Sequence, residues 1–331
     1  MSANLAITIA LIVTAVSFDF LNGFHDSANV VATTISSRAL SPRKALVLAA
    51  LAEAAGPFLF GVAVATTIGH EIVLPEAISP TVIFAGLLGA IAWNIITWIL
   101  GIPSSSSHAL IGGLVGAVAV AHGFSAIQAA GIRKTVIALF TSPILGLIVG
   151  YLFMKLLLWL SRAATPRAND FFKGAQVLTS IGLALSHGTN DAQKSMGIIT
   201  MALVSGGLID SFHVPVWVIA LCAAAIALGT FTGAWRIIKT LGAKFYRIRP
   251  IHGFSAQAAS AAVILGAAVL GGPVSTTQVV SSTIIGVGSA ERVSKVRWGV
   301  AGDIALAWLL TIPASMLMSA LIYLPLHAWL G

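Results

Sequence analysis

Long apolar runs alternate with short polar stretches along the whole chain, and this pattern predicts the architecture. A helix of roughly 20 apolar residues is needed to cross the hydrocarbon core of a bilayer, whereas a buried helix of a soluble protein needs fewer. The pattern therefore predicts an all-α polytopic membrane protein. The predicted passes cover residues 4–36, 44–68, 81–100, 104–121, 133–160, 174–204, 214–234, 254–270, 274–289 and 298–325.

The first and sixth passes differ from the others because each exceeds 30 residues and carries a polar cluster in its middle. Interrupted helices are a common place for polar groups inside a membrane, because their free backbone groups line the protein interior. We expect both passes to be broken helices or re-entrant hairpins of two half-helices. Counting such passes twice gives about 10–12 transmembrane segments.

Composition supports a lipid environment. The 331 residues are 58% hydrophobic and 8% charged, with a mean hydropathy of +0.99, whereas a soluble domain has about 25% charged residues. The formal charge of +8 does not indicate a nucleic-acid partner, because the basic residues collect in short loops between apolar runs. The bilayer is therefore the expected partner, no resident cofactor is expected, and a homo-oligomer remains open.

The basic residues also predict an orientation in the cytoplasmic membrane. They lie in loops near residues 38–44, 162–173, 236–249 and 292–297. The opposite loops, 69–80 and 205–213, contain no Lys or Arg, and only Arg133 and Lys134 disagree. By the positive-inside rule the basic loops are cytoplasmic, which places both termini outside.

Two motifs each occur twice in the same order. Residues 22–29 (NGFHDSAN) resemble 187–194 (HGTNDAQK), and residues 101–108 (GIPSSSSH) resemble 271–278 (GGPVSTTQ). From aspartate to proline the spacing is 77 residues in the first half and 82 in the second. Such self-similarity indicates an internal repeat.

Five passes per half is an odd number, so the second half must enter the membrane from the opposite side. We therefore expect a first inverted repeat at 1–160, a cytoplasmic linker at 161–173 and a second inverted repeat at 174–331. In such folds the cargo site lies near the midplane, where interrupted helices of the two halves meet.

The hydroxyl-rich motifs are candidate anion ligands. Proline suits the first turn of a helix, and the residues after it present free backbone N–H groups and hydroxyls at a positive dipole end. Two such ends facing each other would hold a tetrahedral oxyanion, although small hydroxyl residues also simply allow close helix packing. The candidate ligands are Ser104, Ser105, Ser106, Ser107, Ser275, Thr276 and Thr277.

Two aspartates inside apolar segments, Asp26 and Asp191, are candidate coupling residues, because a charge there costs at least ~2.5–3.5 kcal/mol. A carboxylate beside an anion site repels the cargo until a proton or Na⁺ neutralises it, so the two aspartates would couple cation and anion binding. The alternative is that they cap broken helix ends. His25, Asn29 and Asn190 could complete a sodium shell or a proton relay.

Further ionisable residues lie close to these motifs or inside other passes. Lys194 follows Asp191 by one turn, where it either pairs with that aspartate or touches the anion. Glu53, in the second pass, is a further candidate for the coupling pathway. Asp19, on the helical face of Asp26, is an open candidate, and the histidines that adjoin the motifs, His108 and His187, are candidate supporting residues.

Together, the paired motifs resemble those of the PiT family of inorganic phosphate transporters, in its bacterial branch, over residues 18 to about 303. The resemblance implies secondary active phosphate uptake driven by H⁺ or Na⁺, with cargo that is often a neutral complex of phosphate and a divalent metal. It also implies that Asp26 and Asp191 bind the coupling cation and that the Ser/Thr segments bind phosphate.

Two residues depart from the family pattern. Gln257 stands where sodium-coupled relatives usually carry Glu, and Gln278 stands where many members carry His. The first departure favours protons over sodium. The alternative cargo is sulfate or another oxyanion, because a cradle of hydroxyls and helix dipoles is not unique to phosphate. No set of nucleophile, base and orienting residue stands out, so we expect no enzyme activity.

Overall fold

The computed structural model describes residues 3–163, 165 and 167–330, and this part of the chain is built of helices. It contains no β-strand, only an isolated bridge between Val73 and Ile127. In chain order the helices are α1 (Ala3–Ser36), α2 (Pro42–Leu59), α3 (Ala63–Thr66), η1 (Thr67–Glu71), η2 (Pro75–Ala77), α4 (Pro80–Leu100), α5 (Ser106–His122), η3 (Phe124–Ala126), α6 (Ala129–Leu160), α7 (Ala168–Ser205), α8 (Val216–Thr232), α9 (Trp235–Lys239), η4 (Thr240–Lys244), α10 (Pro250–Val269), α11 (Thr276–Glu291), η5 (Val293–Lys295) and α12 (Trp298–Leu330).

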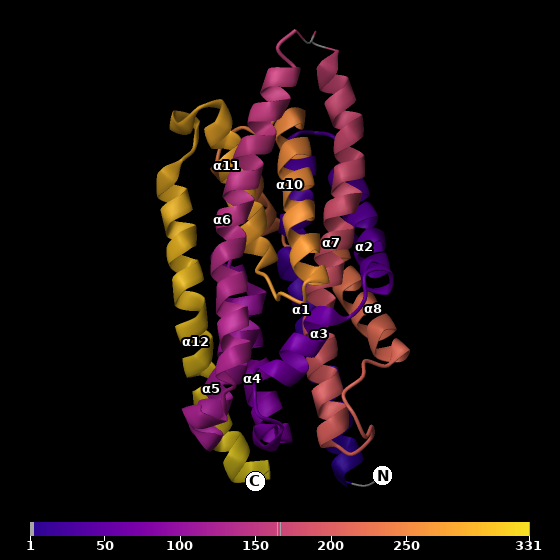
Figure 1. The fold of residues 1–331 in the computed structure, drawn as a ribbon, viewed down its shortest axis with the longest axis vertical. Coiled ribbons are helices and arrows are strands. Elements are labelled where there is room, and N and C mark those ends of the chain that lie inside the picture. Colours follow the sequence, from indigo (N-terminus) through magenta and orange to yellow (C-terminus); the bar gives the residue numbers. More distant parts are fainter. Residues whose placement is uncertain (1–2, 164, 166, 331) are drawn as a thin grey trace.

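The long helices α1 and α7 run through the centre of the bundle without a break (Figure 1). The expectation that the first and sixth passes are broken helices or hairpins is therefore wrong. A polar cluster does not interrupt a helix whose polar side chains all point into the protein interior. Asp26 and Asp191 are both buried in the middle of these helices, so the i→i−4 hydrogen bonds continue past them.

The hairpins lie elsewhere, at α4–α5 and α10–α11 (Figure 1). The bridge between Val73 and Ile127 closes the base of the first hairpin, and an ion pair between Arg249 and Glu291 closes the base of the second. The two bases lie at opposite ends of the bundle, while the tips meet in its middle. The passes predicted at 81–100, 104–121, 254–270 and 274–289 therefore form the arms of two hairpins whose tips meet inside the bundle.

Two further helices are sharply bent. α2 turns by 73° into α3 and η1, and α8 turns by 62° into α9 and η4. The bends follow Gly61 and Gly233, whose φ angles of +80° and +72° are left-handed and strained for residues with a Cβ. Five described helices are long and apolar enough to cross a membrane alone, and the bent pairs raise the number to seven.

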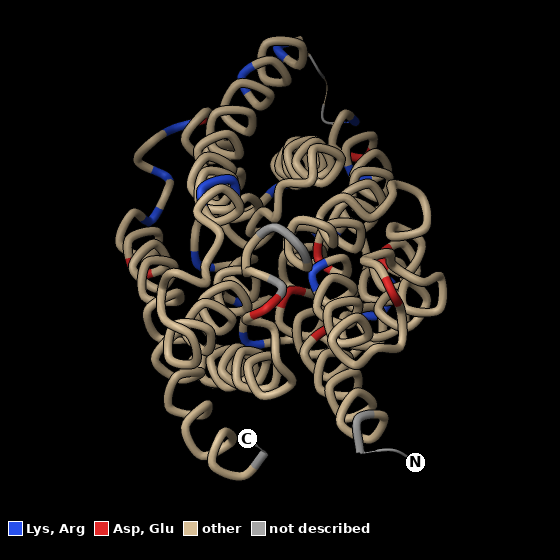
Figure 2. The backbone as a smooth tube through the Cα atoms, turned by 60° about the horizontal axis from the view of Figure 1, so that its bottom comes forward, with Lys and Arg blue, Asp and Glu red and all other residues tan. Residues whose placement is uncertain are grey.

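The ends of the bundle differ in charge. Both termini lie at one end, and the loop between α6 and α7 lies at the other (Figure 1). Charged residues are few, and most of the backbone in Figure 2 is tan, the colour of residues other than Lys, Arg, Asp and Glu. The second end carries the loops between α6 and α7 and between α11 and α12, both of which contain basic residues (Figure 1).

Glycine contacts between helices are reciprocal in the two halves. A Cβ on Gly23 of α1 would lie 2.1 Å from the carbonyl oxygen of Ile226 in α8, and a Cβ on Gly188 of α7 would lie 2.3 Å from that of Glu53 in α2. These glycines occupy the same position in the two copies of the repeated motif. The backbones of α1 and α8, and of α7 and α2, therefore approach as closely as only glycine permits.

Candidate functional site: a buried carboxylate and hydroxyl cluster

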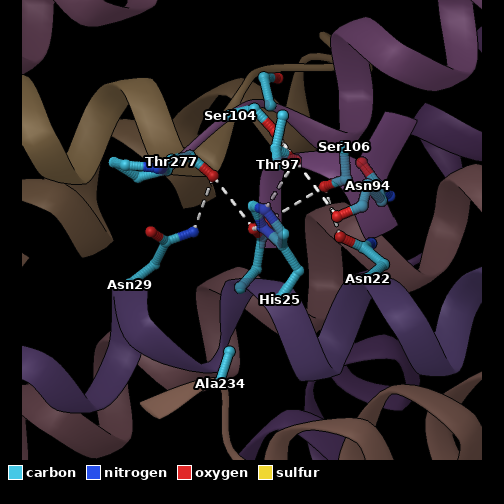
Figure 3. A network of polar contacts seen from close by, with 12 residues as sticks. Asn22, His25, Asn29, Asn94, Thr97, Ser104, Ser106, Ala234 and Thr277 are labelled. Carbon is cyan, nitrogen blue, oxygen red and sulfur yellow. Dashed lines mark hydrogen bonds and ion pairs between the residues drawn. The ribbon is translucent and has the colours of Figure 1, made fainter. Parts of the chain in front are cut away.

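The candidate site is formed where the middle of α1 and α7 meets the two hairpin tips. Its side chains are almost completely buried, with exposed fractions of 0–2%. Figure 3 shows Thr277 and Ser106 approaching the α1 residues from two sides. The predicted ligands from four distant sequence segments thus share one cluster.

The tip of the first hairpin reaches α1 through Ser106. Its hydroxyl lies 2.9 Å from Oδ2 of Asp26 and 2.5 Å from Oδ1 of Asn22, both of which accept hydrogen bonds. Ser107 instead donates to the carbonyl oxygen of Val274 at 3.0 Å, which joins the two tips directly.

The tip of the second hairpin contacts both aspartates. The Thr276 hydroxyl lies 3.0 Å from Oδ2 of Asp191 and 3.5 Å from Oδ2 of Asp26. Thr277 donates to Oδ1 of Asp26 at 3.2 Å and accepts from the amide of Asn29 at 2.9 Å. The candidate anion ligands and candidate coupling residues are therefore bonded to each other.

Ser105 and Ser275 cap the two helices that begin at the hairpin tips. Each is an N-cap whose hydroxyl accepts from the backbone N–H three residues later, at His108 and Gln278. Within the described chain, the backbone N–H groups of the first two helical residues of α5 and α11 donate to no other group. Four free N–H groups at two converging helix N-termini favour an anion.

Ser104 and His25 lie at the edge of the cluster. Ser104 donates to Thr97 at 2.8 Å. His25 lies within 2.8 Å of Oδ1 of Asp26 through Nδ1 and 3.4 Å from Thr97 through Nε2. Ser104 makes no hydrogen bond to either aspartate, so it supports the tip rather than the carboxylates.

Lys194 joins the two tips to α7. Its ammonium group donates to Asp191, to the Ser107 hydroxyl at 2.6 Å and to the Val274 carbonyl at 3.2 Å. An ammonium has three N–H donors, so all of them are used. Of the two predicted alternatives, pairing with Asp191 is the contact present in this structure.

His187, predicted as a supporting residue, lies among three carboxylates, although neither ring nitrogen has hydrogen-bond geometry to them. Its Nε2 lies 3.2 Å from Asp191 and 4.0 Å from Asp26, while Nδ1 lies 3.0 Å from Glu53. Glu53 also accepts a 2.5 Å hydrogen bond from Thr230. The sequence signal for this residue is its position one turn before Asp191, on the same helical face.

The cluster has the ligand types that a cation requires. Asp26, His187 and Asp191 offer atoms within 4.8 Å of one another. The side-chain carbonyl oxygens of Asn29 and Asn190 are buried and make no hydrogen bond within the described chain. Oxygen-rich surroundings suit a hard cation, and carboxylates equally suit a proton.

Comparison with known proteins identifies the family. The phosphate transporter family matches residues 22–319. A protein of Rhizobium meliloti (strain 1021) described as "Probable low-affinity inorganic phosphate transporter" is 49% identical over 327 residues, covering 98% of each chain. A protein of Bacillus subtilis (strain 168) with the same description is 45% identical over 331 residues, covering 99% of each.

The fold is shared with a solved structure, "The sodium-dependent phosphate transporter", with a TM-score of 0.86 and 25% identity. The match covers 98% of this chain and 99% of that one. The paired motifs had indicated this family, and the comparisons confirm it. The chain belongs to the phosphate transporter family and is a multi-pass membrane protein, a transporter and not an enzyme.

Proposed function

We propose that this protein imports inorganic phosphate across the cytoplasmic membrane by cation-coupled symport. The observation that carries the proposal is that the hydroxyls of both hairpin tips are bonded to the carboxylates of Asp26 and Asp191. The same hydroxyls, with the free N–H groups beside them, are the donors that a phosphate would need.

This arrangement supports a coupling mechanism. While the carboxylates are charged they hold the hydroxyls and repel an anion. A proton or Na⁺ on the carboxylates removes the repulsion, and the hydroxyls can turn to phosphate oxygens. Phosphate would then bind well only after the cation, which is what symport requires.

Within this mechanism the side chains divide the work. Ser106, Ser107, Thr276 and Thr277 with the N–H groups bind phosphate, and Lys194 adds a positive charge at the joint of the tips. Asp26 and Asp191 form the cation site, in which Asp26 changes its charge while Asp191 stays paired with Lys194 and His187 lies beside Glu53. Ser104, Ser105 and Ser275 shape the tips.

The surroundings of Gln257 support protons over sodium. Its amide donates to Thr34 at 2.5 Å, and its carbonyl oxygen accepts from Thr179 at 3.0 Å. Both amide groups are thus satisfied by neutral hydroxyls, and no carboxylate stands there to attract a metal cation.

The reciprocal glycine contacts and the matching order of helices support two inverted repeats, 1–160 and 174–331, that rock about the cluster. We propose that the end with the basic loops is cytoplasmic and that both termini are outside. Coupled protons matter energetically, because each positive charge moving inward gains ~2.3 kcal/mol per 100 mV while a bare anion loses as much.

The test is phosphate uptake by purified protein in liposomes, with pH and sodium gradients imposed separately. We expect the pH gradient alone to drive accumulation. Accumulation driven by sodium alone would contradict proton coupling, and uptake that follows only the phosphate gradient would contradict symport.

Cargo is tested in the same liposomes. We expect arsenate, another tetrahedral oxyanion, to compete with phosphate, and sulfate not to compete. Strong competition by sulfate would favour the alternative of a general oxyanion permease. Uptake that requires added Mg²⁺ would show that the cargo is a neutral metal–phosphate complex.

A further inference from the structure

Asp19 is a buried carboxyl group that the proposed mechanism does not use. It lies on α1 with an exposed fraction of 0%, and the Ser195 hydroxyl and the Cys222 thiol lie beside it without reaching hydrogen-bond geometry, so it has no cationic partner of its own. An ionised carboxylate without partners is very costly inside a protein or a membrane. Asp19 must therefore be neutralised by a bound proton or by another cation.

The nearby base cannot neutralise it. The charge of Lys194 acts on Asp19 from a distance. All three N–H donors of this ammonium group are nevertheless taken by Asp191, Ser107 and Val274. His187 is occupied among the carboxylates of the central cluster. Neither Lys194 nor His187 is therefore paired with Asp19.

The ionisable groups around Asp19 come from few elements. α7 brings Asp191 and Lys194, and α8 brings the Cys222 thiol. α4 contains no ionisable residue, and Glu53 of α2 lies against His187. The remaining neighbours of α1, which are α9, η4, α10 and α11, pack on its C-terminal half, at the central cluster or beyond it.

The immediate surroundings suit a proton better than a metal ion. The polar groups beside Asp19 are the Ser195 hydroxyl, itself without a hydrogen bond within the described chain, and the Cys222 thiol. Na⁺ needs a shell of several oxygens, and a thiol is a poor ligand for such a hard cation. A protonated carboxyl needs only one acceptor.

Asp19 lies on the side of the central cluster that faces the end with the termini. It stands seven residues before Asp26, which is about 10 Å nearer the end with the termini. On α7, Ser195 lies between Asp191 and residues Met201 to Ser205. Of these, Met201, Val204 and Ser205 line a cavity of about 510 Å³ at that end, together with Gly69 and Phe212.

We propose that Asp19 is a second proton-carrying carboxyl of this transporter, loaded from the cavity at the end with the termini and placed in series with Asp26. The inference rests on the proposed symport and makes it more specific. The position that corresponds to Asp19 in the second copy of the motif is Ala184, so the site occurs once per chain.

The test compares wild type with Asp19→Asn in liposomes, with the membrane potential held at zero and a pH gradient of one unit. At equilibrium each coupled proton multiplies phosphate accumulation by ten per pH unit. We therefore expect Asp19→Asn to accumulate tenfold less phosphate than wild type, while exchange of phosphate at equal pH continues. Cys222→Ala, which leaves the carboxyl in place, should accumulate as wild type does.

Accumulation by Asp19→Asn equal to that of wild type would overturn this inference alone, whereas a wild type insensitive to the pH gradient would overturn the proposed proton coupling as well. If Asp19→Asn does not fold, Asp19→Glu keeps an ionisable group in altered surroundings. It should keep wild-type accumulation and shift the pH midpoint of uptake. An unchanged midpoint would contradict the proposal.

Discussion

α1 and α7 carry the same motif, but the side chains that surround its aspartate differ between the two helices. Asp191 has Lys194 three residues later and His187 four residues earlier, and it contacts both. At the corresponding positions α1 has Asn29 and Asn22, which carry no charge, and Asp26 is held by hydroxyls and by His25.

This difference separates a fixed charge from a variable one. The charge of Asp191 is matched by a lysine of its own helix and has little reason to change. The charge of Asp26 is matched mainly by neutral donors, which also bind a protonated carboxyl. We therefore expect the α1 side of the cluster to respond to the coupling cation and the α7 side to maintain the geometry.

The largest effect should come from Asp26→Asn, which imitates the loaded carboxyl permanently. We expect the loss of about tenfold phosphate accumulation per pH unit, which is what one coupled proton supplies, because the Asn side chain cannot carry that proton. Phosphate exchange should continue and the protein should still reach the membrane. Accumulation in liposomes measures the effect, and a variant that still concentrates phosphate would remove Asp26 from the coupling mechanism.

On the α7 side, Lys194→Met should act on stability. It leaves Asp191 buried without its cation, and breaking a buried pair in this way costs about 3–5 kcal/mol. Thermal unfolding in detergent measures the loss. The double variant Lys194→Met with Asp191→Asn should regain most of it, and a double variant as unstable as the single one would contradict the fixed-pair interpretation.

The close helix contacts of the two halves should be equivalent, although their aspartates are not. Gly23→Ala and Gly188→Ala test this equivalence. Each adds a Cβ at 2.1 or 2.3 Å from a backbone oxygen of the facing helix, so the helices must separate. We expect both to lose about 1–3 kcal/mol. Gly174→Ala, which has no atom within 4 Å of its Cβ, is the matched control. A loss in only one half would show that the contacts are not equivalent.

The smallest effect concerns the hairpin bases. The Glu291 carboxylate at the second base is partly buried, which raises its pKa, but Lys295, His252 and Arg249 lower it more, to about 2. A lowered pKa in the folded state stabilises the protein above the unfolded value of about 4.5, and the stabilisation disappears as pH falls from there to about 2.

Glu291→Gln should therefore lower the stability at pH 7 by only about 1 kcal/mol, because its Arg249 and Lys295 partners are about half exposed and only His252 is buried. The difference from wild type should vanish at low pH in thermal unfolding. The first hairpin base, held by backbone contacts between Val73 and Ile127, has no such dependence. A difference that persists at pH 2 would contradict the assignment of these ion pairs.

Sequence reasoning located the cluster because buried charges leave few choices. An aspartate inside an apolar helix must face the protein interior, so Asp26 and Asp191 had to lie inward, near each other if the repeats are related by symmetry. The Pro-Ser and Pro-Val-Ser-Thr segments had to begin helices. These constraints come from local composition and are readable without coordinates.

The form of the elements was harder to predict. A glycine beside a polar cluster suggests an interruption, but Gly23 and Gly188 serve close helix packing in unbroken helices. The arms α4 and α10 have the length and hydropathy of a spanning helix, so the sequence predicts separate crossings and does not reveal that they pair with α5 and α11 as hairpins. His187 was undervalued because its three carboxylate contacts come from segments as distant as Glu53.

Lys194 contacts both hairpin tips, and this has a consequence for leakage of ions across the membrane. Because one ammonium group holds Ser107 of the first hairpin and Val274 of the second, neither tip can move away without disturbing the other. Exposure to one side of the membrane and closure to the other are thereby mechanically linked. A continuous pore would require both attachments to fail together, which favours stepwise exchange over free diffusion.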